Sequence, residues 1–101
     1  MPKRQPEALT GTVVDDAVEL TLEEVSIYCA VHEERILALV EEGVVSPRGD
    51  GRRDWRFAGV AITRAARAIR LQRELDVDAH AAAVILDLID EIESLRARLR
   101  P

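Results

Sequence analysis

Three carboxylates near the C-terminal end of the chain are spaced so that a helix would bring them together. Asp87, Asp90 and Glu91 stand at positions i, i+3 and i+4, which share one ridge of an α-helix. Such a ridge is complementary to a basic surface of another protein. It is equally compatible with an ordinary solvated helix face, so the spacing alone leaves both interpretations open.

Arginines are concentrated in the middle of the chain, between two acidic segments. Residues 48–73 contain eight arginines and two aspartates (+6), residues 1–47 ten acids and three bases (−7), and residues 74–101 seven acids and three bases (−4). Half of these arginines recur at every third position: Arg64, Arg67, Arg70 and Arg73. The cluster fits a solvated face paired with the acidic flanks, a residual nucleic-acid contact, or a surface for a protein partner. The net charge of −5 opposes general nucleic-acid binding.

Residues suited to catalysis or metal binding are isolated from one another. His32 and His80 lie far apart, Cys29 is the only cysteine, and neither an HExxH motif nor a Cys/His metal spacing occurs. No phosphate-binding loop or nucleophile motif is present. We interpret His32 as a helix cap, His80 as a first-turn helix residue and Cys29 as a small buried apolar residue. We therefore expect neither enzymatic activity nor a cofactor or metal.

The chain has the length of one domain and no feature that targets a membrane. Its 101 residues suit a single domain. No segment approaches the ~20 apolar residues of a membrane span, and the first residues lack the apolar run of a secretory signal. One cysteine fits a reducing compartment. These features predict a cytoplasmic protein without a membrane partner.

The elements that would position these residues are mainly helices. The spacing of Thr21 and Glu24 is that of a capping box and predicts a helix over about 21–28. A second helix is predicted over about 32–42, closed by Gly43, so that the pair forms a helix-turn-helix. A third helix is predicted over about 60–75 and a fourth over about 79–99, with Asp78 as its N-cap.

The segment between the second and third helices is predicted to form a two-stranded wing. Val44–Pro47 has the character of a short extended piece, residues 48–51 supply turn residues, and Trp55–Phe57 alternates as a strand does. Trp55 and Phe57 would form the core of the wing. Of the two, Trp55 is the better candidate for an exposed ring that contacts a partner.

The last predicted helix carries an apolar seam. Its members step by three and four residues, as the a and d positions of heptads do: Ile85, Leu88, Ile92, Leu95 and Leu99. We expect this seam to pair two copies of the chain in a homodimer, although it could instead pack on the third helix. The seam by itself would also suit another small coiled-coil adaptor, such as a toxin–antitoxin component.

The predicted elements divide the chain into three parts: a flexible tail (1–19), a winged-helix region (20–78) and a C-terminal amphipathic helix (79–101).

Several motifs within residues 20–99 resemble those of one known family. They are Thr21–Val25, Leu39–Val44 and Trp55–Phe57 in the first part, and Arg70–Asp78 and Val84–Ile92 in the second. With these motifs the chain resembles the CbpM family of chaperone modulators, a branch of the MerR-like winged-helix superfamily. Ala58 and Asp78 depart from the serine and asparagine that are usual there.

The resemblance implies both a fold and a function. The fold would be all-α in the main, a MerR-like winged helix-turn-helix with a small two-stranded wing and a long C-terminal helix. Family members are non-enzymatic modulators that bind the J domain of a DnaJ/CbpA-like co-chaperone, and the expected mechanism is occlusion of its DnaK-facing surface. Because J domains carry a basic second helix, the candidate partner-binding residues are Asp87, Asp90, Glu91 and Trp55.

The alternative function is that of a MerR-like DNA-binding transcription regulator. Reading the major groove needs basic or amide side chains at the start of the second helix. Glu33 and Glu34 stand there instead, followed by the apolar residues Leu37 and Leu39. The sequence therefore predicts no specific DNA binding.

Overall fold

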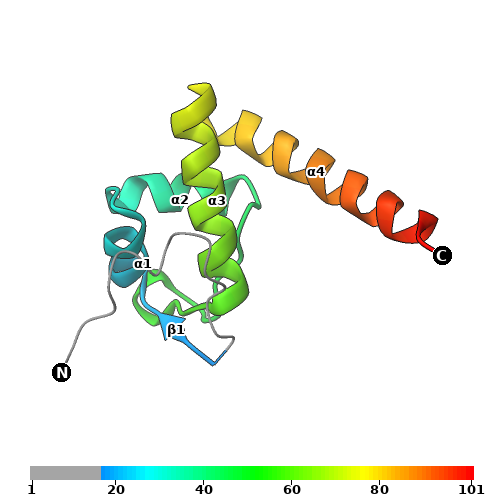
Figure 1. Ribbon diagram of the computed structural model, residues 1–101. Helices are drawn as coiled ribbons and strands as arrows, with labels where there is room; N and C mark the ends of the chain where they lie inside the picture. The colour runs from blue at the N-terminus through cyan, green and yellow to red at the C-terminus, as the bar shows by residue number, and fades with distance from the viewer. Residues whose placement is uncertain (1–16) are drawn as a thin grey trace.

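The computed structural model describes residues 17–101, which form four helices and one two-stranded sheet (Figure 1). The helices are α1 (Leu22–Cys29), α2 (Glu33–Glu41), α3 (Gly59–Leu75) and α4 (Ala79–Leu99). The strands are β1 (Glu19–Leu20) and β2 (Phe57–Ala58). A short 3-10 helix, η2 (Arg52–Asp54), precedes β2. The predicted fold class, mainly helical with a small two-stranded sheet, is confirmed.

Local signals determine where the first helices begin and end. The backbone N–H of Glu24 donates to Thr21 Oγ1 (3.1 Å) and that of Thr21 donates to Glu24 Oε1 (2.9 Å), so the predicted capping box is present. α1 ends where Ala30 adopts the left-handed conformation (φ 59°). Three residues separate α1 from α2, and the last of them, His32, is an N-cap whose side chain makes no capping hydrogen bond. Gly43 (φ 76°) ends this segment in a conformation that suits glycine.

The sheet differs from the predicted wing in the identity of one strand. β2 lies where a strand was expected, but its partner is β1, with Leu20 opposite Phe57 in an antiparallel register. The expected first strand, Val44–Pro47, does not form, and Val44 and Val45 are buried in the core instead. The isolated bridge in this region joins Arg48, in the predicted turn, to Arg56. Most of the predicted tail (1–19) lies outside the described residues, and its last residue, Glu19, belongs to β1.

The turn of this region depends on one glycine. Gly49 has φ 116°, and a Cβ at this position would lie 2.5 Å from the carbonyl oxygen of Asp54. Neither the backbone conformation nor the available space would accept another side chain. Gly49 therefore allows the chain to fold back from Arg48 toward Arg56.

The core lies between α1, α2, α3 and the root of α4. Apart from the ring of Phe57 and the thiol of Cys29 it is aliphatic, and its fully buried members include Val25, Ile36, Leu39, Ile62 and Leu86. α3 approaches its neighbours through small residues, since Ala65 and Ala68 have no exposed surface. This close approach brings α4 against α3 over the first part of its length.

α4 continues beyond this body as an arm. Its N-cap Asp78 accepts from the backbone N–H of Ala81 (2.8 Å), and Ala82 and Leu86 are buried. From residue 90 onward every residue is exposed, and Figure 1 shows the helix extending away from the body to the C terminus. At 21 residues the helix is about 30 Å long. Within residues 17–101, no helix combines the length and apolar character needed to cross a membrane.

Candidate functional site

The three predicted partner-binding carboxylates lie together on α4, and we call them the acidic ridge (Asp87, Asp90 and Glu91). All three are exposed. The side chain of Asp87 is 80% exposed and that of Asp90 47%. The ridge lies where α4 leaves the body: Asp87 and Asp90 contact α3, whereas Glu91 makes no hydrogen bond or ion pair within residues 17–101.

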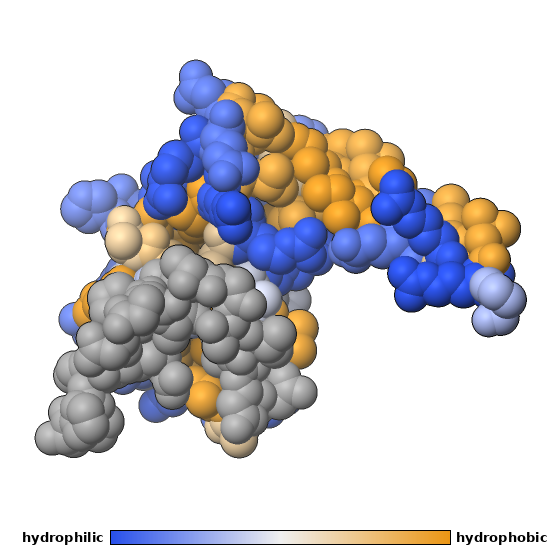
Figure 2. All heavy atoms as spheres, viewed as in Figure 1, coloured by the Kyte–Doolittle hydropathy of each residue, from blue (hydrophilic) through white to orange (hydrophobic). Residues whose placement is uncertain are grey.

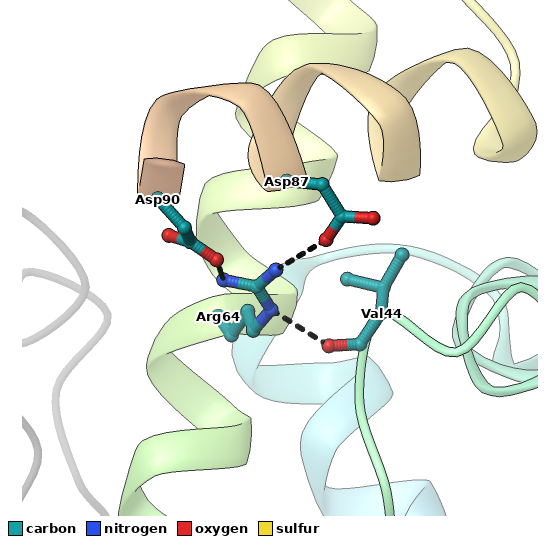
Figure 3. A network of polar contacts seen from close by, with 4 residues as sticks. All are labelled: Val44, Arg64, Asp87 and Asp90. Atoms are coloured by element: carbon teal, nitrogen blue, oxygen red, sulfur yellow. Dashed lines mark hydrogen bonds and ion pairs between the residues drawn. The ribbon is translucent and has the colours of Figure 1, made fainter. Parts of the chain in front are cut away.

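Arg64 of α3 is bound to this ridge. Its guanidinium reaches Asp90 Oδ2 through Nη1 (3.0 Å) and Asp87 Oδ1 through Nη2 (3.6 Å), and its Nε donates to the carbonyl oxygen of Val44 (2.8 Å). Figure 3 shows the guanidinium between the two aspartates on one side and Val44 on the other. The Arg64 side chain is only 24% exposed. The ridge is thus held by an internal cation, and one oxygen each of Asp87 and Asp90 stays outside these contacts.

Trp55 lies apart from the acidic ridge. Its ring meets that of Phe57 edge to face, with centroids 6.1 Å apart and an interplanar angle of 89°, and it packs against the core as a partly buried residue. No hydrogen bond, ion pair or ring contact joins it to α4 among residues 17–101. β1, the partner of the strand that follows Trp55, lies at the opposite end of the body from α4 (Figure 1).

The predicted seam is exposed on the arm. Ile85 is half-buried at the root of the helix, whereas the exposed fractions of Leu88, Ile92, Leu95 and Leu99 are 58%, 49%, 44% and 83%. Val84 adds a further exposed apolar side chain (46%). Figure 2 shows hydrophobic residues continuing along α4 beyond the body. The described residues of the chain do not cover this seam, so it does not pack on α3 as the alternative prediction required.

The surface that a helix-turn-helix protein would turn toward DNA is acidic. Glu33 and Glu34 are exposed in the first turn of α2. The next residue along the helix, Arg35, is basic, and its Nη2 donates to Oε1 of Gln72 on α3 (3.3 Å). The recognition end of α2 thus presents two carboxylates, while its one arginine is engaged with α3.

The remaining titratable candidates, Cys29 and His80, are a buried thiol and a histidine hydrogen-bonded to a carboxylate. Burial raises the pKa of the Cys29 thiol from 9.0 to about 11, so this thiol stays protonated and unreactive at neutral pH. His80 Nδ1 lies 3.0 Å from Glu42 Oε1 at the junction of α4 and α2, and this hydrogen bond, followed by the charge of Glu42, raises the pKa of His80. In the described part of the chain, no three His, Cys, Asp or Glu side chains are grouped so that they could hold a metal ion.

The sequence prediction did not include Arg64 among the site residues. The four arginines at every third position suggested one continuous face, but a step of three residues turns an α-helix by about 60° short of a full turn. Successive arginines therefore wind around α3. Arg64 precedes the buried Ala68 by four residues and so shares the side of α3 that meets α4. The same spacing places Arg73 four residues after the buried Ile69, so the sequence pattern alone does not single out Arg64. Only the packing of α4 on α3 selects it.

Comparisons with known proteins agree with this architecture. A family model described as MerR HTH family regulatory protein matches residues 20–101. The chaperone modulatory protein CbpM of Coxiella burnetii is 32% identical over 92 residues, which cover 91% of this chain and 87% of that protein. The proteins of the same name from two Salmonella strains, paratyphi B and newport, are 36% identical over 83 residues, 82% of each chain.

Proposed function

Since this chain belongs to the family of the chaperone modulatory proteins CbpM and to the MerR-type helix-turn-helix regulators in fold, we propose that it binds the J domain of a DnaJ/CbpA-like co-chaperone and inhibits it. Membership of this family supports a chaperone-regulating role without catalysis. The finer mechanism that we propose is occlusion, in which this chain covers the J-domain surface that otherwise engages a DnaK-type chaperone.

The observation that carries this proposal is the acidic ridge at the root of the arm. A J domain presents a basic helix, and Asp87, Asp90 and Glu91 offer carboxylate oxygens at helical spacing on an exposed face. Arg64 holds the first two in place and leaves one oxygen of each for an incoming lysine or arginine. Preorganised carboxylates lose little conformational entropy on binding, and charge complementarity favours rapid encounter.

We also propose that two copies of the chain pair through the seam. Four of its five members are exposed on the arm, where they make an apolar stripe with heptad spacing. A soluble chain seldom leaves such a stripe uncovered. At about 100° per residue the seam and the acidic ridge occupy adjacent faces of α4, so a homodimer leaves both ridges accessible to the J domain.

Binding kinetics against a cognate J domain test the role of the ridge. Charge reversal of Asp87 and Glu91 to lysine should slow association and flatten its dependence on salt, because exposed charges act mainly on the encounter rate. The matched control is Glu41→Lys, which makes the same change at an exposed position on α2 and should leave association nearly unchanged. Binding that ignores both salt and the double reversal would exclude the ridge from the mechanism.

Trp55 provides a second test in the same experiment. The structure places its ring against Phe57, so Trp55→Ala should lower the free energy of unfolding and leave the dissociation rate of the folded fraction unchanged. Circular dichroism would give the folded fraction. Faster dissociation of a fully folded variant would show that the ring reaches the J domain.

A further inference from the structure

A pocket of about 420 Å³ opens where four segments meet, away from the acidic ridge and the seam. Its volume lies within the roughly 300–1,000 Å³ of small-molecule sites. The turn before α2, the first turn of α2, the C-terminal end of α3 and the turn into α4 form its wall. The lining residues are Val31, Arg35, Ile69, Gln72, Arg73, Asp76 and Val77.

Two arginines on the wall have no carboxylate partner among the described residues. Arg48, Arg64 and Arg70 each contact a carboxylate. Arg35 instead makes a long hydrogen bond with the neutral amide of Gln72 (3.3 Å), and Arg73 makes no hydrogen bond or ion pair within residues 17–101. Two guanidinium groups around one hollow offer several N–H donors, and a planar fork of donors matches a carboxylate.

The other lining residues restrict the ligand further. Among the described residues Asp76 is the only acid on the wall, so the two arginines and this aspartate give a local charge of +1, which suits a monoanion better than a dianion. The apolar part of the wall is aliphatic: Ile69 is 3% exposed, and Val31 and Val77 are half-buried. The pocket thus combines donors for one carboxylate with an aliphatic surface of small area.

We propose that this pocket binds a carboxylate carried by a compact aliphatic group. The carboxylate would accept hydrogen bonds from Arg35 and Arg73, and the aliphatic group would cover Val31, Ile69 and Val77. Such a group can come from a free short-chain acid or from the end of a peptide whose last residue is aliphatic. This site is independent of the proposed contact with a J domain, because none of its residues belongs to the acidic ridge or the seam.

Chemical-shift mapping of the full-length protein with isovalerate tests this proposal. Amide signals of residues around the pocket should shift and saturate, whereas isovaleramide, the uncharged isostere, should produce no saturable change. Arg35→Gln and Arg73→Gln should each weaken binding on the order of tenfold, because each removes a charge-assisted interaction. Arg70→Gln is the matched control, since Arg70 is on the same helix but pairs with Glu74 outside the pocket, and it should leave the affinity unchanged.

A substitution of Asp76 tests the charge argument in the opposite direction. Asp76 has φ 56°, a conformation that asparagine tolerates well, so Asp76→Asn keeps the backbone conformation and removes the negative charge of this side chain. Isovalerate should then bind several-fold more tightly. Dispersed amide spectra would show that each variant is folded, so a loss of binding is attributable to the pocket.

Two further ligands distinguish the sources of the carboxylate. A short peptide that ends in valine should shift the same signals only when its C terminus is free, not when it is amidated. If the peptide binds saturably and isovalerate does not bind, the site is assigned to a peptide end. The proposal fails if neither ligand produces saturable shifts, if isovaleramide binds equally well, if Arg70→Gln weakens binding as much as Arg73→Gln, or if inorganic phosphate binds in preference to both carboxylates.

Discussion

Arg64 joins three parts of the molecule that are far apart in sequence. Its guanidinium contacts the backbone of Val44 after α2 and the side chains of Asp87 and Asp90 on α4. The arginine side chain is largely buried, whereas the side chains of the two aspartates are exposed. Loss of the contacts would therefore cost more free energy at the arginine and at the Val44 carbonyl than at the carboxylates. An unpaired buried polar group is costly, so this residue fixes the position from which the arm leaves the body.

We predict that Arg64→Gln lowers the free energy of unfolding by roughly 1–3 kcal/mol, because it removes hydrogen bonds of a charged group and unpairs the Val44 carbonyl. Arg67→Gln is the control, since Arg67 is exposed on the same helix, and it should change stability by no more than about 0.5 kcal/mol. Urea denaturation followed by circular dichroism measures both. Equal stability of the two variants would show that the Arg64 contacts do not hold the arm.

His80 and Glu42 form a second, pH-dependent contact between α4 and α2. The hydrogen bond to Glu42 raises the pKa of His80 above its ordinary value of 6.5. A raised pKa in the folded state means that the stabilisation is fully present below 6.5 and is lost as the pH rises through the raised value.

We therefore predict that Glu42→Gln lowers the pKa of the His80 ring toward 6.5, measured by an NMR titration of the ring protons. The difference in the free energy of unfolding between the wild type and His80→Gln should be largest below pH 6.5 and should shrink above the raised pKa of His80. A ring that titrates identically in the wild type and in Glu42→Gln would contradict the contact.

Among the elements, α4 combines two roles along one helix. Its first part buries Ala82 and Leu86 in the core, which anchors the helix, and its second part exposes the seam. Helix periodicity alone produces both faces, since the buried and the seam residues repeat with similar spacing on different sides. The second part is an arm because no other element of the described chain buries a residue of α4 beyond residue 89, and residues 90–101 are all exposed.

We predict that the wild type sediments as a dimer and that the double variant Leu88→Lys with Ile92→Lys sediments as a folded monomer. Both side chains are about half exposed in the single chain, so the substitutions should not disturb the core. Ser94→Lys, on another side of the arm, is the control and should leave the dimer intact. Sedimentation of the wild type as a monomer at high micromolar concentration would rule out pairing through the seam.

The whole molecule distributes its charge so that acidic surfaces flank an arginine-rich middle. The structure uses several of these arginines internally, because Arg48 pairs with Glu19, Arg64 with the acidic ridge and Arg70 with Glu74. The basic segment is thereby partly neutralised. α2 presents Glu33 and Glu34 where reading of the major groove would need basic or amide side chains.

We predict that selection from random duplexes at low salt recovers no enriched sequence, since phosphates and base acceptors would be repelled by the recognition end of α2. The control is Glu33→Gln with Glu34→Gln, which should raise only weak, sequence-independent binding. A recovered motif bound with a dissociation constant near the ~10⁻⁸ M of specific complexes would overturn the proposed adaptor function.

The sequence by itself determined the features that depend on neighbours within one turn of a helix. The capping box at Thr21, the N-cap at Asp78 and the seam of α4 were all predictable, because caps and apolar spacing act over three or four residues. The bounds of α4 agree with the prediction, and α3 begins one residue earlier than predicted, at Gly59, without a capping side chain. The acidic ridge was also predictable as a juxtaposition, since its members share one helix.

The tertiary structure decided every contact between segments distant in the chain. β1 and β2 are two residues each, too short to show alternation, so only the packing of Leu20 near Phe57 selects this pair over the expected one. The choice of Arg64 as the partner of Asp87 and Asp90, and the meeting of Arg35 with Arg73 around one pocket, depend on how α2 and α4 pack on α3. Small buried alanines permit that packing, and no local pattern specifies which charged residues it brings together.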